Sequence, residues 1–449
     1  MGSNEIEEVR SILFYETIEY AIKNSPFYRK LYRHARLDYN DYRADITKLP
    51  IIDTNTAIKN AAKIMCKRQN VITHQRTGGT TGRPEFFIYR SEEEFRIHEQ
   101  RCSTRVLSHN REKKTLIMNI QGLTHGLPLF VRSSDVYIVL YDCFDLSLAE
   151  EFLLKKHDIP GVENKVNCIC AHVGLLKRLT RQMLRKGTNL KTLGVEYLVS
   201  TGDYVPQMWR KLLAEMWGAT FVDNYSLAEI IGDISQCKIC GDYHPGSSLI
   251  AEVVSIDDFK PIESGIGLLV LTSLYPYQQA FPLIRYDTGD LFEVIQKKCV
   301  DTALYPKGRL LWSIYIKLQE DPFTCLVPQS DIIETVESLP DTNRFNDYDI
   351  DASEQLNVEI RSTDTSWESP KFFLEKNSDN GRPHVVLNLE LNYDPVIYPS
   401  RVHELSSFIL EELCRRSPSF DRSISNNQIS FDTVFHPPNT ISPSKILLR

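Results

Sequence analysis

Short apolar runs alternate with helical segments through the middle of this 449-residue chain. Strand-like runs occupy residues 115–120, 135–140, 166–170 and 195–200, and helical patterns occupy residues 147–156 and 174–186. This alternation is typical of an α/β fold with a largely parallel sheet, because each helix carries the chain back to start the next strand in the same direction. It constrains the fold more than any other feature of the sequence.

Length and composition limit the class of protein. The length predicts two or three units, and 42% hydrophobic with 25% charged residues is typical of a globular protein. A formal net charge of −7 argues against a nucleic-acid partner and favours a small-molecule one. We find no apolar run that could span a bilayer and no signal-peptide pattern, so we expect a cytoplasmic protein with no membrane partner. Ten cysteines in such a chain indicate reduced thiols rather than disulfides.

A glycine- and threonine-rich loop lies between the strand-like residues 71–73 and 86–89. It consists of Thr77, Gly78, Gly79, Thr80, Thr81, Gly82 and Arg83, followed by Pro84. Backbone N–H groups, hydroxyls and a guanidinium in one loop suit an anion such as a polyphosphate. The loop is not the P-loop of NTPases, because the required Gly-Lys-Ser/Thr is replaced by Arg-Pro-Glu. A β-turn decorated with polar residues is the alternative.

Two further loops follow strand-like runs, at the edge where α/β sheets hold ligands. The first contains His125 and Gly126, and an ordinary loop histidine is the alternative. The second consists of Ser200, Thr201, Gly202 and Asp203, ahead of the helical residues 206–217. Its small side chains can admit a ring or a carboxylate. The alternative is a strand-to-helix turn with its acidic residue near a helix N-terminus.

Two more stretches carry polar residues with specific chemistry. Asn224, Tyr225, Ser226 and Glu229 follow a strand-like run, and the Ser-x-x-Glu spacing within them also fits a capping box at the start of a helix. Farther on, Asp290 ends a Thr-Gly-Asp turn. Its two acceptor oxygens suit the 2′,3′-diol of a ribose, and a simple turn is the alternative.

Taken in order, these stretches resemble the motifs of the adenylate-forming superfamily, which includes acyl-CoA ligases, luciferase and peptide-synthetase adenylation domains. The loop at 77–84 is similar to its phosphate loop, with Arg83 in place of the usual Lys. Residues 224–229 are similar to Asn-Tyr-Gly-x-Thr/Ser-Glu, with Ser226 for Gly and Ala228 for Thr/Ser. Residues 282–290 match Pro-Leu-Ile-Arg-Tyr-x-Thr-Gly-Asp. The Asn-Ser-Pro-Phe-Tyr turn at 24–28 and the later Leu-Pro pair resemble the phenylacetate-CoA ligase branch.

The resemblance implies an ATP-dependent ligase that activates a carboxylic acid as an acyl-adenylate and releases pyrophosphate. Residues 77–83 would hold the β and γ phosphates, with Arg83 among the catalytic residues. Tyr225 would stack on adenine, Glu229 would bind Mg²⁺, and Asp290 would bind the ribose. Residues 200–203 would border adenine and the acyl group, and residues 125–126 the acyl pocket. Coenzyme A is the default acceptor of the acyl group.

The resemblance also implies a domain organisation. A large N-terminal adenylating domain with mixed or parallel sheets and helices would span residues 1–309, and a small mobile α+β C-terminal domain would span 310–449. In the latter, the pattern predicts helices from about residue 329 and over 399–416, a strand over 384–391, and a loop or solvated insertion over 362–382. The sequence does not define an oligomeric state, and a dimer is compatible with it.

Two departures from the family leave alternatives open. Arg309 would contact ribose or phosphate, but the usual hinge after it is replaced by Leu-Leu-Trp. Lys445 would stabilise the transition state, although the spacing around it differs and a solvated tail lysine is the alternative. The acceptor is therefore a thiol, such as coenzyme A or a carrier protein, or instead an amine. A non-catalytic structural or regulatory relative is a further alternative.

Cys237, Cys240 and His244 form a Cys-x-x-Cys-x-x-x-His pattern. Soft ligands on one turn are typical of a structural zinc site. Members of the phenylacetate-CoA ligase branch carry similar residues here, and also cysteines after the later Thr-Gly-Asp, so Cys299 is the candidate fourth ligand. Unlinked thiols and an imidazole are the alternative.

Overall fold

The computed structural model describes residues 3–34, 45–66, 70–76, 86–101, 113–120, 136–140, 146–202, 204–237, 240–295, 303–318, 324–345, 369–379 and 381–441. The chain divides into two compact units. The first comprises Met1–His172, Asn189–Asp203 and Ala214–Pro306, and the second comprises Val173–Thr188, Tyr204–Leu213 and Lys307–Arg449. The domain division after residue 309 stays a prediction. No helix within the described ranges is both long and apolar enough to cross a membrane.

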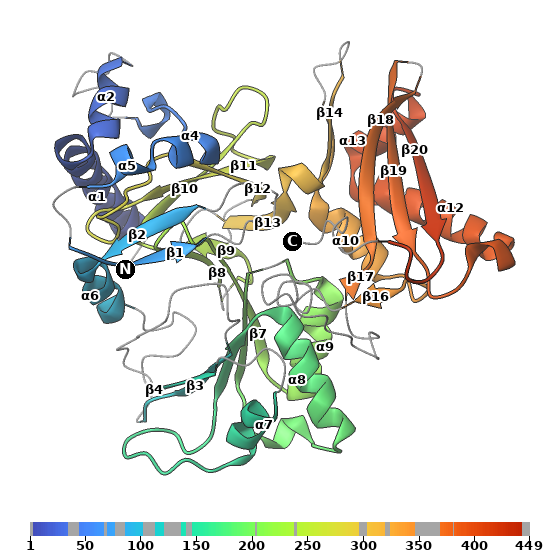
Figure 1. Cartoon of the computed structure of the whole chain (residues 1–449), viewed down its shortest axis with the longest axis horizontal. Coiled ribbons are helices and arrows are strands. Elements are labelled where there is room, and N and C mark those ends of the chain that lie inside the picture. Colours follow the sequence, from blue (N-terminus) through green and yellow to red (C-terminus); the bar gives the residue numbers. More distant parts are fainter. Residues whose placement is uncertain are drawn as a thin grey trace. The chain divides into compact units, whose positions relative to one another are not determined.

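An eleven-stranded sheet dominates the first unit among the described residues (Figure 1). In spatial order its strands are β10 (Leu249–Val254), β11 (Gly265–Ser273), β12 (Tyr286–Ile295), β13 (Ala303–Arg309), β9 (Tyr243–Pro245), β8 (Asp233–Gln236), β7 (Thr220–Ser226), β6 (Tyr197–Thr201), β5 (Cys168–Ala171), β3 (Leu116–Ile120) and β4 (Val136–Leu140). The strands from β4 to β7 are parallel, whereas β7 to β9 and β10 to β12 pair in antiparallel fashion. The predicted mixed α/β fold is confirmed.

The parallel strands consist of the apolar runs that predicted them. Ile117, Ile169, Leu198 and Val222 are buried on β3, β5, β6 and β7, as expected for strands covered on both faces. The helices between and after them are α7 (Ser147–Leu154), α8 (Val173–Arg185) and α9 (Gln207–Trp217). All three were predicted from their helical periodicity.

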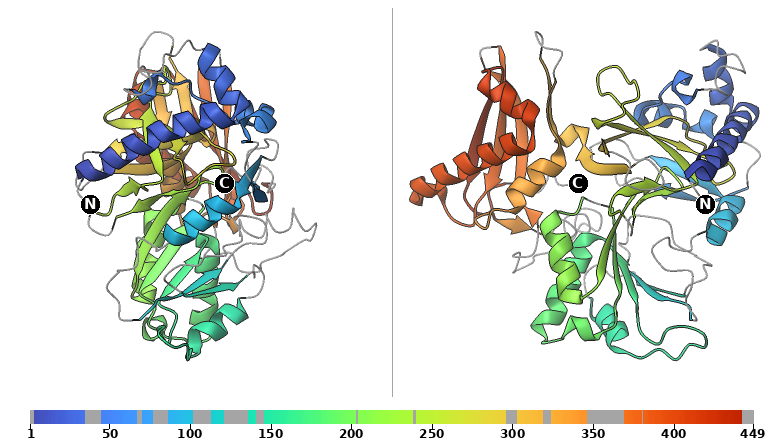
Figure 2. Two further views of the ribbon diagram at one scale, coloured as in Figure 1. Left: turned by 90° about the vertical axis from the view of Figure 1, so that its left-hand side faces the viewer. Right: turned by 180° about the vertical axis from the view of Figure 1, so that it is seen from behind.

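The N-terminal helices pack on the antiparallel part of the first unit. Only Ser25 separates helix α1 (Ser3–Asn24) from helix α2 (Pro26–His34), at the predicted break, and α1 is the long blue helix in the left view of Figure 2. Thr17 accepts a hydrogen bond from the backbone of Tyr275, and the phenol of Tyr28 donates to the carbonyl of Pro282. These buried contacts tie the first helices to the segment that leads into β12.

Shorter elements complete the first unit. They are η1 (Ile46–Lys48), α4 (Thr54–Lys59), α5 (Ala61–Ile64), β1 (Val71–Arg76), β2 (Phe87–Ser91), α6 (Glu92–Arg101) and η2 (Leu190–Thr192). The predicted serine cap of α6 is confirmed, because the N–H of Glu94 donates to Oγ of Ser91 and the N–H of Ser91 donates to Glu94 Oε2. Strands β1 and β2 are antiparallel partners, and Arg76 at the end of β1 pairs with Phe87 at the start of β2. The predicted phosphate loop therefore falls between two paired strands.

The second unit has its own core. Its sheet contains β18 (Phe372–Asp379), β19 (Arg382–Glu390) and β20 (Ser430–His436), beside helices α10 (Gln329–Glu337), α12 (Pro399–Arg416) and α13 (Pro418–Ser425) (Figure 1). Apolar residues of β19 such as Leu387 pack with Ile409 and Leu413 of α12. The remaining elements are η3 (Leu310–Trp312), β14 (Ile314–Lys317), β15 (Thr324–Val327), β16 (Arg344–Phe345), β17 (Ser369–Pro370) and η4 (Pro395–Ile397).

One prediction for the second unit is wrong. Residues 362–382 were expected to form a loop or solvated insertion, but residues 369–370 and 372–379 are strands. The polar residues misled the prediction because β18 is an edge strand whose second half is exposed. The signal was present, since Phe372 is buried and Asp379 pairs with Arg382 across an Asn-Gly dipeptide, which is typical of a two-residue hairpin turn.

Candidate functional site

Two polar side chains from distant parts of the sequence meet in the first unit. The phenol of Tyr225, in β7, donates a hydrogen bond of 2.6 Å to Oδ2 of Asp290, in β12. The Tyr225 ring also packs edge-on against Phe292, with 4.8 Å between the ring centroids. Strands β8, β9 and β13 lie between β7 and β12 in the sheet order. The sheet must therefore curl strongly to bring these side chains together.

The Thr-Gly-Asp turn is a bulge in β12. Leu268 pairs with Leu291 and Val270 with Asp287, so β12 has extra residues between two positions that are close on β11. Gly289 takes a positive φ of 74° within the bulge, which favours glycine there. The hydroxyl of Thr288 donates to the carbonyl of Leu269 and accepts from the N–H of Asp290. The threonine thus fixes the backbone that carries the buried aspartate.

The predicted magnesium ligand Glu229 lies in the connection between β7 and β8. Ser226 pairs with Asp233, and residues 227–232 form turns and bends rather than the first turn of a helix, so the capping-box interpretation is wrong. Gly232 closes this hairpin connection with a φ of 138°, and a Cβ there would lie 2.7 Å from the side chain of Leu249. Only glycine satisfies this turn.

A tyrosine links the Glu229 connection to β12. The phenol of Tyr286 donates to Glu229 Oε1 at 3.3 Å and lies 2.9 Å from the hydroxyl of Thr54. Burial raises the pKa of Tyr286 well above its ordinary value, and the negative charge of Glu229 raises it further. The phenol therefore stays a neutral donor throughout the physiological pH range. Each acidic residue is thus contacted by a tyrosine from the other segment. Tyr225 of β7 contacts Asp290, and Tyr286 of β12 contacts Glu229.

Two buried side chains hold the same connection from other segments. Gln278 accepts a hydrogen bond from the N–H of Ile231 at 2.9 Å and donates to the carbonyl of Glu229 at 3.0 Å. The guanidinium of Arg90, on β2, donates to the carbonyl of Ala228 at 2.8 Å. Burial lowers the pKa of Arg90 to about 10, although the charges of Glu94 and Glu229 oppose that change.

Sequence analysis missed these supporting residues. Tyr286 lies inside the matched Arg-Tyr-x-Thr-Gly-Asp stretch and could have been singled out. Gln278 and Arg90 gave no signal, because their partners are backbone groups far away along the chain.

The predicted residues of β6 and β7 lie at the carboxyl ends of parallel strands. Ser200 pairs with Asp223, and Thr201 pairs with Asn224. The Oγ of Ser200 and the Oδ1 of Asn224 are buried and have no hydrogen-bond partner among the described residues. Buried polar atoms of this kind are usually satisfied in the functional state. A ligand at this edge of the sheet would provide what they lack.

His172, directly after β5, is a further residue at this edge that sequence analysis did not identify. Gly202 has a φ of 110°, and a Cβ at this position would lie 3.2 Å from the ring of His172. The histidine directly follows β5, so it belongs to the same edge as Ser200 and Asn224.

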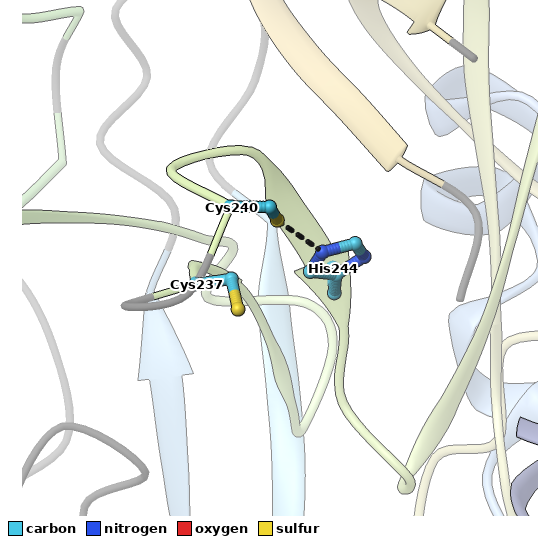
Figure 3. A group of neighbouring side chains, drawn as sticks. All are labelled: Cys237, Cys240 and His244. Carbon is cyan, nitrogen blue, oxygen red and sulfur yellow. Dashed lines mark hydrogen bonds between the residues drawn. The ribbon is translucent and has the colours of Figure 1, made fainter. Parts of the chain in front are cut away.

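The predicted metal ligands of the β8–β9 hairpin converge (Figure 3). One ligand atom from each of Cys237, Cys240 and His244 lies within 4.8 Å of the other two, and Cys240 Sγ lies 3.1 Å from His244 Nε2. Ligand atoms around tetrahedral zinc lie roughly 3.5 Å apart, so small shifts of these side chains would suit the ion. Gly241, with a φ of 77°, donates its N–H to the carbonyl of Cys237 and closes the turn.

The hairpin is fastened to the strand that carries Tyr225. The phenol of Tyr243, in β9, donates a hydrogen bond of 2.5 Å to Asp223, in β7. Both side chains are buried. Order in the turn that carries Cys237 and Cys240 therefore bears on the position of β7.

Other predicted residues lie elsewhere. Arg309 belongs to the second unit, where its N–H donates to Gln329 Oε1 at 2.7 Å and its guanidinium lies 5.6 Å from the ring centre of Trp312. Its predicted contact with a nucleotide stays a prediction. The remaining candidates lie outside the described residues, and their roles also stay predictions: Thr77, Gly78, Gly79, Thr80, Thr81, Gly82, Arg83, His125, Gly126, Asp203, Cys299 and Lys445.

A comparison in sequence identifies a relative among enzymes that form coenzyme A thioesters. No protein-family model matches the chain. Phenylacetate-coenzyme A ligase from Thermus thermophilus is 24% identical over 296 residues, which cover 63% of this chain and 64% of that enzyme. The match therefore spans a little less than two thirds of the relative's own length.

Comparisons in structure cover more of the chain. A 2-hydroxyisobutyryl-CoA ligase in complex with 2-HIB-AMP matches with a TM-score of 0.66 at 13% identity, over all of this chain and 90% of that one. ATP-bound MatB from Rhodopseudomonas palustris matches with a TM-score of 0.52 at 14% identity, over 83% of this chain and 66% of that one. The fold is thus that of the adenylate-forming enzymes. In sequence, the chain is similar to a phenylacetate-coenzyme A ligase.

Proposed function

We propose that this chain is an ATP-dependent ligase that activates a carboxylic acid as an acyl-adenylate and transfers the acyl group to coenzyme A. The sequence relative is named a coenzyme A ligase, and structural neighbours hold an acyl-AMP alone or with CoA. The observation that carries the proposal is the 2.6 Å hydrogen bond between Tyr225 and Asp290. It joins the two motifs that the family uses for adenine and ribose, although they lie 65 residues apart.

The reaction divides into two displacements. A carboxylate oxygen of the acid attacks the α-phosphorus of ATP, the bond from that phosphorus to the bridging oxygen breaks, and pyrophosphate leaves with the electron pair. The sulfur of the coenzyme A thiolate then attacks the acyl carbon, and AMP leaves. Both steps depend mainly on positioning and charge stabilisation. Lys445 and Arg83 are proposed to stabilise the charge that develops in the first step.

The described residues support the binding part of this scheme. Tyr225 would present its ring to adenine and Asp290 its carboxylate to ribose. The unpartnered Ser200 and Asn224 atoms would face polar groups of the ligand. Residues 77–83 and residues 125–126 lie outside the described ranges, and we propose that they hold the phosphates and border the acyl group, respectively.

Magnesium fits the connection between β7 and β8, which contains Glu229. Glu229 provides a carboxylate oxygen, the ligand type that Mg²⁺ prefers, and Tyr286 orients that oxygen by its hydrogen bond. Bound Mg²⁺ would neutralise phosphate charge. Arg90 and Gln278 hold the backbone on either side of the carboxylate, so the residues present suit the ion.

We further propose a structural zinc ion in the β8–β9 hairpin. Cys237, Cys240 and His244 offer two sulfur atoms and one nitrogen atom close together, which is the donor set of structural zinc sites. Cys299 is the proposed fourth ligand. The ion would stabilise the hairpin that lies beside β7 in the sheet.

A panel of carboxylic acids tests the proposed activity. Purified chain with ATP and Mg²⁺ should release pyrophosphate in an acid-dependent manner, and added coenzyme A should convert the acid to a thioester identified by mass. An amide after addition of amines would instead support the amide-forming alternative, and acylation of a carrier protein would make its thiol the acceptor. A chain that binds no ATP and turns over no acid would contradict the proposal and favour a non-catalytic relative. A cytoplasmic location and a dimeric state stay predictions.

A further inference from the structure

The carboxylate of Asp290 is held at two levels. The bulge fixes its backbone, because the N–H of Asp290 donates to the hydroxyl of Thr288 at 3.1 Å. The phenol of Tyr225 fixes its side chain by the 2.6 Å hydrogen bond to Oδ2. Asp290 is only 5% exposed, so water does little to set the orientation of the carboxylate. A bond this short to a carboxylate is charge-assisted and therefore strong.

The Tyr225 ring is held by the same strand. Phe292 follows Asp290 by two residues on β12, and the Tyr225 side chain contacts both of them. The Phe292 ring meets the Tyr225 ring at an interplanar angle of 78°, a favourable edge-to-face arrangement. One strand thus restrains both the ring of Tyr225 and its hydroxyl.

Resting on the proposed function, we propose that the Tyr225 hydroxyl is the positioning group for the ribose-binding carboxylate of Asp290. A single tyrosine then couples recognition of the base to recognition of the sugar. Its ring faces adenine while its hydroxyl sets the direction in which Asp290 accepts the ribose hydroxyl hydrogens. Loss of the hydroxyl should weaken contacts to the 2′ and 3′ hydroxyls and leave contacts to the base unchanged.

Binding of two nucleotides to Tyr225→Phe tests the proposal. ATP and 2′,3′-dideoxyATP are titrated with Mg²⁺ into the full chain by calorimetry, which needs no knowledge of the acid. The variant keeps the ring and its contact with Phe292. We expect the Kd of ATP to rise about tenfold, in line with loss of a charge-assisted hydrogen bond. The Kd of 2′,3′-dideoxyATP should change less than about twofold, because that ligand has no ribose hydroxyls for Asp290 to bind.

Two variants sharpen the test. Asp290→Asn should also reduce the preference for ATP over 2′,3′-dideoxyATP, and adding Tyr225→Phe to it should cost little more, since the two residues act through one contact. Tyr393→Phe is the matched control, because its phenol donates to Asp341 at 2.9 Å in the second unit. The control should bind both nucleotides as the native chain does.

The outcomes separate this inference from the proposed function. If Tyr225→Phe weakens both nucleotides equally, or neither, the hydroxyl does not position the ribose carboxylate and the inference is wrong. Native chain that binds ATP and prefers it over 2′,3′-dideoxyATP would support the nucleotide site in either case. Native chain that binds no ATP would overturn the proposed function and this inference with it.

Discussion

Glu390, at the end of β19, is the most heavily hydrogen-bonded carboxylate described in the second unit, and we predict that Glu390→Gln destabilises that unit. The side chain is fully buried. Its oxygens accept from the amide of Asn343, the ammonium of Lys371 and the backbone N–H groups of Asn439, Thr440 and Ile441. The carboxylate therefore ties two loops and the segment after β20 to the sheet.

The expected magnitude follows from these partners. Glutamine replaces one accepting oxygen with a donor, so either Thr440 and Ile441, which share Oε2, or the groups on Oε1 lose their acceptor. Each buried donor without a partner costs about 1–3 kcal/mol. Lys371, only 13% exposed, also loses its counter-charge, and breaking a buried pair costs about 3–5 kcal/mol. Because these costs overlap, we expect a net loss of about 3–5 kcal/mol.

Native-state hydrogen exchange of the β19 amides measures this loss locally, without assuming that both units unfold together. Glu375→Gln is the matched control: it makes the same change on the neighbouring strand β18, where Glu375 is exposed. The control should alter the opening free energy by less than about 0.5 kcal/mol. A loss below about 1 kcal/mol in Glu390→Gln would refute the argument from buried partners.

The contribution of Glu390 should depend on pH in one direction. Burial raises its pKa, but hydrogen bonds from Ile441, Lys371 and Asn439 outweigh burial and hold the pKa below the ordinary value. A carboxylate with a lowered folded-state pKa stabilises the protein fully above the unfolded-state pKa, about 4.3. Its contribution is lost as the pH falls through the folded-state value. The difference between native chain and Glu390→Gln should therefore be constant from about pH 5 to 8 and shrink below about pH 4.

Three further predictions concern the first unit. Gln278→Leu leaves three backbone groups without their partner and so loosens the connection that carries Glu229. Acid-dependent pyrophosphate release should then need severalfold more Mg²⁺. An unchanged Mg²⁺ dependence would argue against a positioning role of Gln278. Cys240→Ser should abolish about one equivalent of bound zinc in metal analysis and lower the Tm, whereas native chain purified without zinc would contradict the metal site. Arg285→Lys keeps the positive charge but loses the two-pronged hydrogen bond to Glu252, both ends of which are buried, and should cost about 1–3 kcal/mol in urea unfolding; a loss below about 0.5 kcal/mol would show that the lysine ammonium replaces the guanidinium.

Local patterns predicted most of the elements. The buried runs around Ile117 and Ile169 could only be strands of a covered sheet, and the periodicity of residues 399–416 predicted α12 with its observed bounds. Local patterns failed where a distant partner decides. The Ser226-x-x-Glu229 spacing suits a helix cap, but pairing of Ser226 with Asp233 turns the segment into a hairpin connection.

The candidate site could be predicted only in part. Chemistry and family resemblance pointed to Tyr225 and Asp290, but no local rule brings residues 65 positions apart into contact. That contact depends on curling of the whole sheet. Gln278 was unpredictable for a related reason, because a glutamine that binds backbone groups carries no spacing pattern of its own.

The β8–β9 hairpin acts as a spacer within the sheet. It stands between β7 and β13, the neighbour of β12, so its two strands belong to the stretch of sheet that must bend before Tyr225 reaches Asp290. Inserting or deleting one residue within a strand of this hairpin would turn the side chains beyond it to the opposite face, and Tyr243 would then lose its hydrogen bond to Asp223 of β7, although no residue proposed to contact the nucleotide would change. A change far from Tyr225 and Asp290 could therefore alter the contact between them, because both strands belong to one continuous sheet.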